Sequence, residues 1–405
     1  MGTIANSNTR IFYATQAATI GAIGNISSPE EGWTNEASSP QTGAATLTHG
    51  VQSIGIDTNF NLEQAFELGQ LSLYENIEDI PEIAVSMQKF LDGYSLLYHL
   101  GASYDGDGTV ISTTNTSLSG RADTRADVRL VLNATTDEAV TTGDSGVAEL
   151  YCSGMYMSSV SYTIPTDGTC TEDVSFVGNN KKWLTDDGDP DSDMVLINGA
   201  AGLDTNFGTI FGDDAPNYST GHVLRREDVV TGSTAIQGYS TVMPSIIEGI
   251  VADSGTAIKS RMAVGAGILN TANAHIQSFN CSVDLGRESI NQLGTKTPYS
   301  RYVTFPTEVT SAIEVIAIGG DNVDALENNR TNLINHEICV VLKDSTVMHL
   351  GKKNKVSSIT YGGGDAGGGN ASITYNFSNF NDLVVLHSGD PIRTDGTYWD
   401  DKFGV

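Results

Sequence analysis

Hydrophobic and polar residues alternate along several short stretches of the chain, and clusters of turn residues separate these stretches. In residues 82–88 and 158–163, apolar side chains recur at every second position. A period of two puts alternate side chains on opposite faces of a β-strand, so that one face can be buried. The intervening Gly, Ser, Thr and Asn favour turns. The pattern predicts a mainly β protein in which helix is a minority.

Two long hairpins are predicted from these stretches. The first joins residues 150–163 to residues 170–178, and the second joins residues 356–361 to residues 371–377 through a glycine-rich turn. Long hairpins leave strand edges that can pair with another subunit.

A short helix is predicted beside the sheet in each half of the chain. In the first half, one face would hold Leu62, Ala65 and Phe66, with Asn59 or Asn61 as the cap and Gly69 at the end. In the second half, Ile290 and Leu293 would form the inward face before Gly294.

The chain contains one pattern twice, in the same order. Without a gap, residues 52–86 and 277–311 share eight identities, where chance would give about two. The identical pairs are Gln52/Gln277, Ser53/Ser278, Glu63/Glu288, Leu68/Leu293, Gly69/Gly294, Tyr74/Tyr299, Pro81/Pro306 and Ser86/Ser311. Residues 158–162 also correspond to residues 357–361. A duplicated unit presents one surface twice, so a single chain can fill two equivalent places in a symmetric assembly.

The repeat predicts two tandem β units. The first spans residues 1–195 and carries a loop insertion within about 101–148, and the second spans residues 222–387. An acidic, glycine-rich connector at 196–221 would join them, and residues 388–405 would form a polar tail. Each unit is long enough to bury its own core.

The formal net charge is −28. Acidity of this size repels nucleic acid and argues against a protein that grips phosphates. Two interpretations stay open: a solvated acidic surface, or a surface that DNA passes without binding.

The four cysteines, Cys152, Cys170, Cys281 and Cys339, have no paired spacing and are predicted to be buried free thiols. No apolar run has the length of a membrane span, and the first residues do not predict a signal peptide.

No stretch specifies an active site, so neither enzyme activity nor a cofactor or metal is expected. The acidic loop at 186–193 offers oxygen ligands for calcium, but Pro190 and the lack of a later bidentate Glu favour a solvated loop. Gly362, Gly364 and Gly367 match the spacing of a dinucleotide fingerprint. A strand follows them in place of a helix N-terminus, which favours a flexible hairpin tip.

Two basic pairs, Lys181-Lys182 and Lys352-Lys353, lie beside the two hairpins. On an acidic chain such pairs are expected to meet acidic partners in contacts between subunits or rings. The hairpin tip at Gly364 and Asp365 is expected to take part in the same contacts.

Several stretches resemble the tail tube proteins of tailed bacteriophages. They are residues 10–14, 57–64, 73–81, 91–94, 150–182, 287–288, 298–299 and 361–370. The resemblance covers both units and implies β-sandwich or rolled-sheet units, each with a flanking helix. In that family the units join into rings whose inner strands form a continuous β-barrel. The rings stack into a hollow tube through which DNA leaves the capsid.

The resemblance implies a structural protein of the virion tail that is assembled in the host cytoplasm. Its partners would be copies of itself and other tail proteins at the tube ends, while DNA would pass through the lumen without specific binding. Most members of the family carry one unit and form hexameric rings. Three chains of two units each would fill the same six positions.

Pro81 and Pro306 are predicted to occupy equivalent turns, because proline belongs at the start or edge of a strand. The strands that follow them are predicted to line this channel. The residues predicted to face the channel are Glu82, Ser86, Glu308, Thr310 and Glu314, opposite an apolar face of Ile83, Val85, Met87, Val309, Ile313 and Val315. Carboxylates in a channel would repel phosphates and let DNA slide.

Two other classes of protein stay open. A β-rich capsid surface or decoration protein would carry duplicated units without a lumen. A repeated-β carbohydrate-binding protein or enzyme would need a carboxylate pair or an aromatic platform in both units. The one acidic identity, Glu63/Glu288, is instead expected to support the first turn of the predicted helix.

Overall fold

The structure is a computed structural model and consists mostly of antiparallel β-sheet. The described residues are 13–22, 45–47, 51–69, 73–91, 103–104, 110–111, 118, 125–133, 146–185, 223–230, 241–248, 274–294, 298, 300–317, 335–343, 346–363 and 370–386. The described helical elements with defined bounds are the 3-10 turn η1 (Arg226–Asp228) and α6 (Ser245–Glu248). The predicted mainly β class is confirmed.

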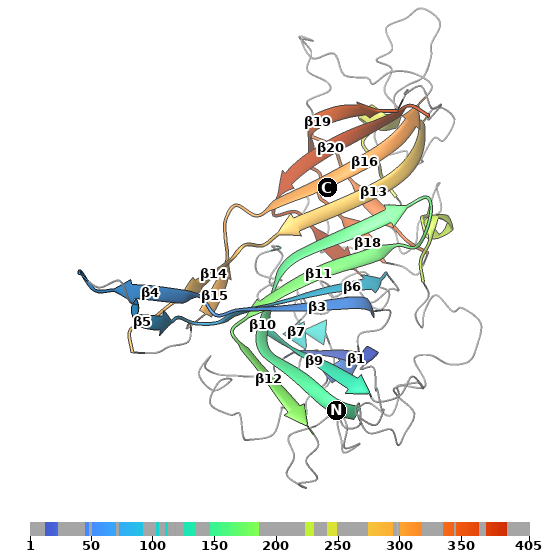
Figure 1. Ribbon diagram of the computed structural model, residues 1–405. Coiled ribbons are helices and arrows are strands. Elements are labelled where there is room, and N and C mark those ends of the chain that lie inside the picture. The colour runs from blue at the N-terminus through green and yellow to red at the C-terminus, as the bar shows by residue number, and fades with distance from the viewer. Residues whose placement is uncertain are drawn as a thin grey trace, which may run out of the picture.

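One twelve-stranded sheet dominates the molecule, and eight of its strands follow one another in the order β19-β20-β16-β13-β10-β11-β6-β3 (Figure 1). Their bounds are β3 Val51–Asn59, β6 Glu82–Phe90, β10 Gly146–Pro165, β11 Thr171–Gly178, β13 Ala274–Asp284, β16 Glu308–Ala317, β19 Lys355–Gly362 and β20 Ser372–Phe380. Both predicted hairpins are present, as β10–β11 and β19–β20. Pro81 stands directly before β6, and Pro306 stands two residues before β16, so each precedes a strand as predicted. The strand registers match β6 to β16 with a shift of one residue from the ungapped repeat, so exposed Ser86 corresponds to Ala312 and not to the buried Ser311.

The same strand order occurs twice along this path. The first sheet group is β10-β11-β6-β3, and the second sheet group is β19-β20-β16-β13. Breaks in register fall at matching places in the two groups. They lie between Met157 and Ser159 in β10, Val356 and Ser358 in β19, Val51 and Ser53 in β3, and Ile276 and Ser278 in β13. The two groups therefore correspond strand for strand and bulge for bulge.

A turn with one conformation follows β3 and β13. Asn61 and Gly286 both have positive φ, at 38° and 45°. The Asn61 N–H donates to Asn59 Oδ1 at 3.2 Å, and the Gly286 N–H donates to Asp284 Oδ1 at 2.9 Å. Gly and Asn are the residues that adopt this left-handed conformation most cheaply.

Each turn leads into a two-stranded hairpin, and the predicted helices at these places are wrong. The first arm is β4 (Leu62–Phe66) with β5 (Leu73–Glu78), and the second arm is β14 (Arg287–Ile290) with β15 (Ser300–Val303). A short helix is stable only where it buries an apolar face, and β4 has no buried residue. Pairing with β5 satisfies its backbone instead. Glu63 and Glu288 accordingly lie in strands, where the Tyr302 hydroxyl donates to Glu288 Oε2 at 2.5 Å.

The large sheet continues beyond the first sheet group along the first half of β10. This half pairs with β9 (Arg125–Asn133) and β12 (Asn180–Thr185), and β1 (Tyr13–Ala22) and β2 (Ala45–Leu47) extend it further. The predicted insertion at 101–148 thus includes β9 and the short strands β7 (Ser103–Tyr104) and β8 (Val110–Ile111). The predicted connector at 196–221 and the tail at 388–405 lie outside the described residues.

A three-stranded sheet packs behind the second sheet group. It contains β17 (Cys339–Val341), β18 (Val347–His349) and β21 (Val384–Leu386). Val340 and Met348 join the main core with Ile313, Tyr375 and Phe377 of the large sheet. The second half is therefore a two-layer sandwich whose core lies between its sheets.

The first sheet group buries an ion pair where the second is apolar. Lys89 Nζ lies 3.9 Å from Glu172 Oε2, and both side chains are at most 1% exposed. The Tyr162 hydroxyl donates to the other oxygen of Glu172 at 3.0 Å. The matching neighbours in the second group are Val315 and Ile373.

Candidate functional site

The residues predicted to line a channel lie on one exposed face of the large sheet. Burial along β6 alternates strictly, with Glu82 and Ser86 exposed and Ile83, Val85 and Met87 buried. The alternation predicted for β16 is confirmed too: Glu308 and Thr310 are exposed and Glu314 is half-buried, while Val309, Ile313 and Val315 are buried. Their role in a channel stays a prediction.

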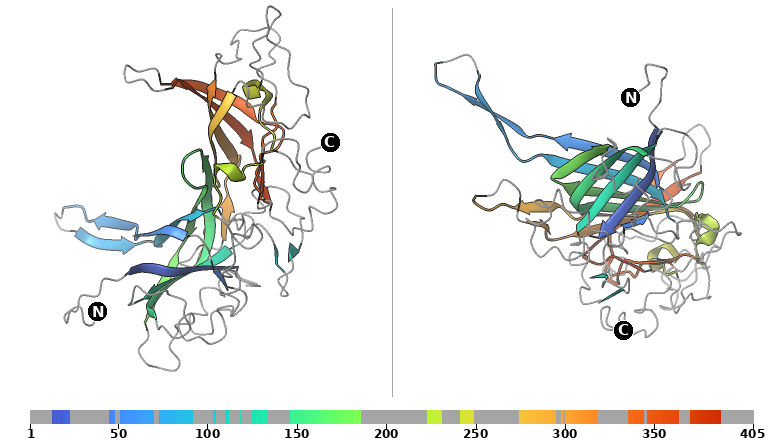
Figure 2. Two further views of the ribbon diagram at one scale, coloured as in Figure 1. Left: turned by 90° about the vertical axis from the view of Figure 1, so that its right-hand side faces the viewer. Right: turned by 90° about the horizontal axis from the view of Figure 1, so that it is seen from below.

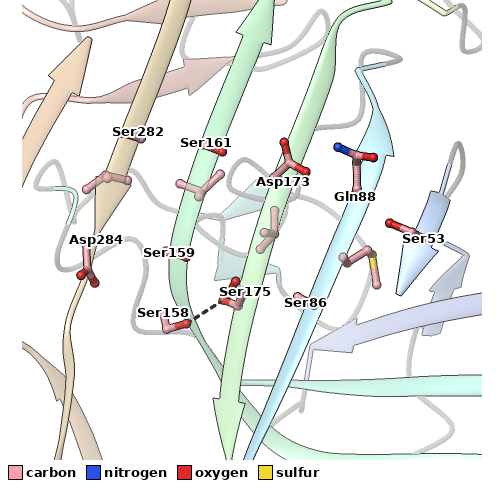
Figure 3. Close-up of a pocket in the computed structure, with 14 residues that line it drawn as sticks. Ser53, Ser86, Gln88, Ser158, Ser159, Ser161, Asp173, Ser175, Ser282 and Asp284 are labelled. Atoms are coloured by element: carbon pink, nitrogen blue, oxygen red, sulfur yellow. Dashed lines mark hydrogen bonds between the residues drawn. The ribbon is translucent and has the colours of Figure 1, made fainter. Parts of the chain in front are cut away.

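Hydroxyl groups cover the centre of this face, which we call the polar face. Figure 3 shows serines from five neighbouring strands, β3, β6, β11, β10 and β13, together with Asp173 and Asp284. The Ser158 hydroxyl donates to the Ser175 carbonyl at 3.1 Å. The hydroxyls of Ser282 and Thr310 share a hydrogen bond of 2.8 Å. Small polar side chains make this surface shallow and well solvated.

The polar face carries negative charge. Its carboxylates, placed by strand register, are Asp57, Glu82, Asp173, Asp284, Glu308 and Glu314. Among the described residues on this face of β19, β20, β16, β13, the second half of β10, β11, β6 and β3, Lys355 at the outer end of β19 is the one lysine or arginine. Arg287 and Arg301 of the second arm border the face beside Asp57 and Glu82. Such a surface repels a polyanion.

The second arm is anchored on the first sheet group at its base. Arg301 donates to Asn179 Oδ1 through two nitrogens, at 3.2 and 3.4 Å, and lies 3.8 Å from Glu82. Burial lowers the pKa of Arg301, while Glu82 opposes this shift. Arg287 donates to the Met157 carbonyl at 2.7 Å, with its guanidinium carbon 5.3 Å from the centre of the Tyr156 ring.

The two sheet groups meet where β13 pairs with β10, at what we call the internal junction. Seven residue pairs join the strands, from Ser159 with Asp284 to Pro165 with Ser278. Just past β13, the Leu285 N–H donates to the Ser158 carbonyl at 2.8 Å. Leu285 is completely buried there.

The two ends of the strand path are open edges. Among the described strands, β3 pairs with β6 alone and β19 pairs with β20 alone. β3 corresponds to β13 and β19 corresponds to β10, so the open edges match the two sides of the internal junction. Unpaired edges of this length are sites for association with another chain.

Both arms project from the same side of the molecule (Figures 1 and 2). The first arm and its approach carry large exposed apolar side chains, namely Phe60, Leu62, Phe66, Leu68, Leu73, Tyr74 and Ile77. An apolar surface of this extent on a projecting element marks an interaction site.

The predicted basic contacts have mixed outcomes. Lys181 donates to the Thr58 hydroxyl, within the chain, from β12 to β3. Lys352 is half-buried and Lys353 is exposed, whereas the side chain of Lys182 and residues Gly364 and Asp365 lie outside the described parts. Their role between subunits stays a prediction.

His349 has structural contacts with Glu337 and Gly351. His349 Nε2 lies 3.3 Å from Glu337 Oε1, and His349 Nδ1 accepts the Gly351 N–H at 2.9 Å. The hydrogen bond from His349 lowers the pKa of Glu337.

Within the described residues there is no cluster of His, Cys, Asp and Glu that could hold a metal, and none of the helices is long and apolar enough to cross a membrane. The acidic loop at 186–193 lies outside the described residues.

Sequence reasoning missed the anchoring of the second arm. Arg301 and Asn179 are 122 positions apart, and no local pattern links them. The buried ion pair left a signal, because Lys89 occupies the apolar phase of β6 and Glu172 occupies that of β11.

These features define a mainly antiparallel β protein with a repeated four-stranded sheet group, a polar sheet face and two open edges. No protein-family model matches the chain, and no curated protein matches it. Among solved structures, it is similar to a chain of the anti-feeding prophage baseplate, with a TM-score of 0.26 and 8% identity over 42% of this chain and 91% of that one. It is also similar to a chain of the anti-feeding prophage cap that terminates the tube, with a TM-score of 0.26 and 9% identity over 46% of this chain and 99% of that one. Both scores are too low to define a shared fold.

Proposed function

We propose that this protein is a structural, non-enzymatic component of a phage virion that assembles head to tail into rings of a tail tube. Each ring would contain three chains and six sheet groups derived from one duplicated unit. The polar face would line the channel.

One observation carries the proposal: the open edges are the counterparts of the strands that already pair inside the chain. β13 meets β10 at the internal junction, so β3 of one chain can meet β19 of the next in the same way. An interface between two different surfaces is heterologous, and its repetition gives a closed ring or an open helix. Closing the ring removes both exposed edges.

The internal junction also predicts the register between chains. Applying the correspondences of β10 with β19 and of β13 with β3 pairs Thr360 with Asp57 and Tyr361 with Ile56. The strands would run antiparallel, as they do at the internal junction.

The chemistry of the polar face supports a channel for DNA. Six carboxylates and many hydroxyls would face the phosphates of the duplex. Lysine and arginine would bind those phosphates and retain DNA, whereas carboxylates repel them.

Cysteine cross-linking of the purified full-length chain, with electron microscopy of the same sample, tests the proposal. The native cysteines are all buried, so new surface cysteines report on the interface. The variants are Asp57→Cys/Thr360→Cys and Ile56→Cys/Tyr361→Cys, because adjacent pairs alternate between wide and close spacing and the close pair suits a disulfide. The control, Ser53→Cys/Thr360→Cys, is out of register by four residues, roughly 13 Å along the strand.

We expect at least one in-register pair to give a covalent ladder that ends at three chains, together with rings in micrographs. The control should stay monomeric on a denaturing gel. Rings of six chains would overturn the stoichiometry. Monomeric protein without cross-links at any concentration would overturn the assembly.

A further inference from the structure

The two arms have different surroundings although their backbones correspond. The second arm rests on the first sheet group through Arg287 and Arg301, which share one face of the hairpin with the buried Val303. The same face of the first arm holds Leu62, Asn76 and Glu78, and nothing in the described part of the chain covers it. We call this the inner face of the arm.

The approach to each arm shows the same contrast. Leu285, just after β13, is completely buried against the first sheet group. Its counterpart Phe60, just after β3, is 59% exposed. A large aromatic side chain that is exposed in this position is typical of a residue that becomes buried in an interface.

The structure assigns these surfaces to one contact: Phe60 and the inner face of the first arm bind the outer end of β19 and β20 on the next copy of this chain. The inference rests on the proposed ring and names a second surface within the same interface. The corresponding contact inside the chain gives the geometry, since the second arm already lies on the equivalent part of β10 and β11.

The contact inside the chain and the proposed contact between chains place positive charge on opposite partners. Inside the chain, cations on the arm meet Tyr156, Asn179 and Glu82 on the sheet. Between chains, Lys355 takes the place of Tyr156, and Phe380 takes the place of Asn179. Both are exposed, Phe380 by 58%.

The first arm fits this second surface. Leu62, which is 61% exposed, takes the place of Arg287 and would lie over the methylene chain of Lys355, while Asn76 takes the place of Arg301 beside Phe380. Glu78 pairs with Leu62 across the arm, so its carboxylate can meet the Lys355 ammonium. Arg287 of a second arm would instead meet Lys355, a like charge. The exchange of charge thus favours the first arm over a second arm at the outer end of β19 and β20.

The test compares association of full-length variants by sedimentation or mass photometry, with circular dichroism as the check on folding. Phe60→Ser removes the anchor, and Ile77→Ser on the outer face of the same arm is the matched control. Glu78→Lys and Lys355→Glu each reverse one charge, and the double variant Glu78→Lys/Lys355→Glu restores the pair. Each variant is also made with Asp57→Cys/Thr360→Cys, which reports on strand pairing separately.

We expect Phe60→Ser to weaken ring association by at least about 30-fold, as loss of an interface hot spot does, and Ile77→Ser to change it by less than about threefold. Each charge reversal should weaken association about tenfold, and the double variant should recover to within about threefold of wild type. If the cysteine pair still cross-links while Phe60→Ser and both reversals associate like wild type, the ring stands and the arm contact is wrong. If neither rings nor cross-links form with the wild-type arm, the proposed ring itself fails.

Discussion

The buried ion pair of the first sheet group gives a quantitative prediction about stability. Lys89 and Glu172 are cross-strand neighbours in the core, and the Tyr162 hydroxyl completes the group. Replacing Lys89 with Met leaves a buried carboxylate without its lysine. Loss of one partner from a buried pair costs about 3–5 kcal/mol. That loss is a large fraction of a typical stability of about 5–15 kcal/mol.

The second sheet group suggests how to remove the pair without this cost. Val315 and Ile373 occupy the corresponding positions, so the same backbone accepts two apolar residues there. The double variant Lys89→Val/Glu172→Ile should recover most of the loss. It still orphans the Tyr162 hydroxyl at a cost of about 1–3 kcal/mol, so Tyr162→Phe should recover the remainder.

Urea unfolding followed by far-UV circular dichroism measures these differences. A loss of 3 kcal/mol moves the midpoint by about 1 M for a slope of roughly 3 kcal/mol per molar urea. All variants must be compared in one assembly state, because association stabilises the folded chain. The reasoning is refuted if Lys89→Met unfolds within about 0.2 M of wild type, or if the double variant Lys89→Val/Glu172→Ile is less stable than Lys89→Met.

Three further predictions concern other parts of the molecule. The four native cysteines should resist thiol reagents at pH 8 until urea unfolds the protein, because all four are buried. Burial also raises the pKa of Cys281 to about 12. Rapid labelling of the native protein would contradict their burial. His349 lowers the pKa of Glu337 below its ordinary value of 4.5. This contact therefore stabilises the protein above pH 4.5, and its contribution is lost as the pH falls through the lower pKa of the folded state. Glu337→Gln should flatten the acid side of a plot of stability against pH, and an unchanged plot would show that the contact contributes nothing. Glu308→Lys/Glu314→Lys should leave tube assembly intact but cause assembled tubes to retain DNA in a salt-dependent gel-shift assay. No retention would argue against these residues lining the channel. Glu82 stays unchanged in this variant because it contacts Arg301.

Local periodicity predicted the strands that bury one face. β6 alternates between exposed and buried positions over eight residues, and a partner strand on each side keeps that pattern in place. The same reasoning failed at residues 59–69. Leu62, Ala65 and Phe66 have helical spacing, but Leu62, Gln64 and Phe66 also share one face of a strand. Residues 73–78 decided the outcome by supplying a strand partner, which the spacing of β4 alone could not reveal.

The contacts that build the candidate interfaces were beyond local reasoning for a different reason. Arg301 reaches Asn179 because β13 pairs with β10, and that pairing joins two sheet groups distant in sequence. The identities between residues 52–86 and 277–311 indicated equivalent positions, yet Phe60 and Leu285 differ in residue type. Only their unequal burial identifies Phe60 as the counterpart of a completed contact.

The difference between the two junctions has a thermodynamic consequence for assembly. The internal junction forms within one chain, at an effective concentration set by covalent linkage, so its strands pair without a loss of translational freedom. In the proposed ring of three chains, only the junctions between β3 and β19 would depend on protein concentration. Duplication would therefore halve the number of junctions between chains in a ring of six sheet groups and leave each half free to diverge. Arg287 and Arg301 stabilise the contact inside the chain, while Phe60, Leu62 and Glu78 remain exposed for the contact with the next copy. Making the first arm resemble the second, by Leu62→Arg/Asn76→Arg, should place cations against Lys355 and stop ring growth without unfolding the chain. If such a variant still formed rings like the wild type, ring growth could not depend on the exchange of charge.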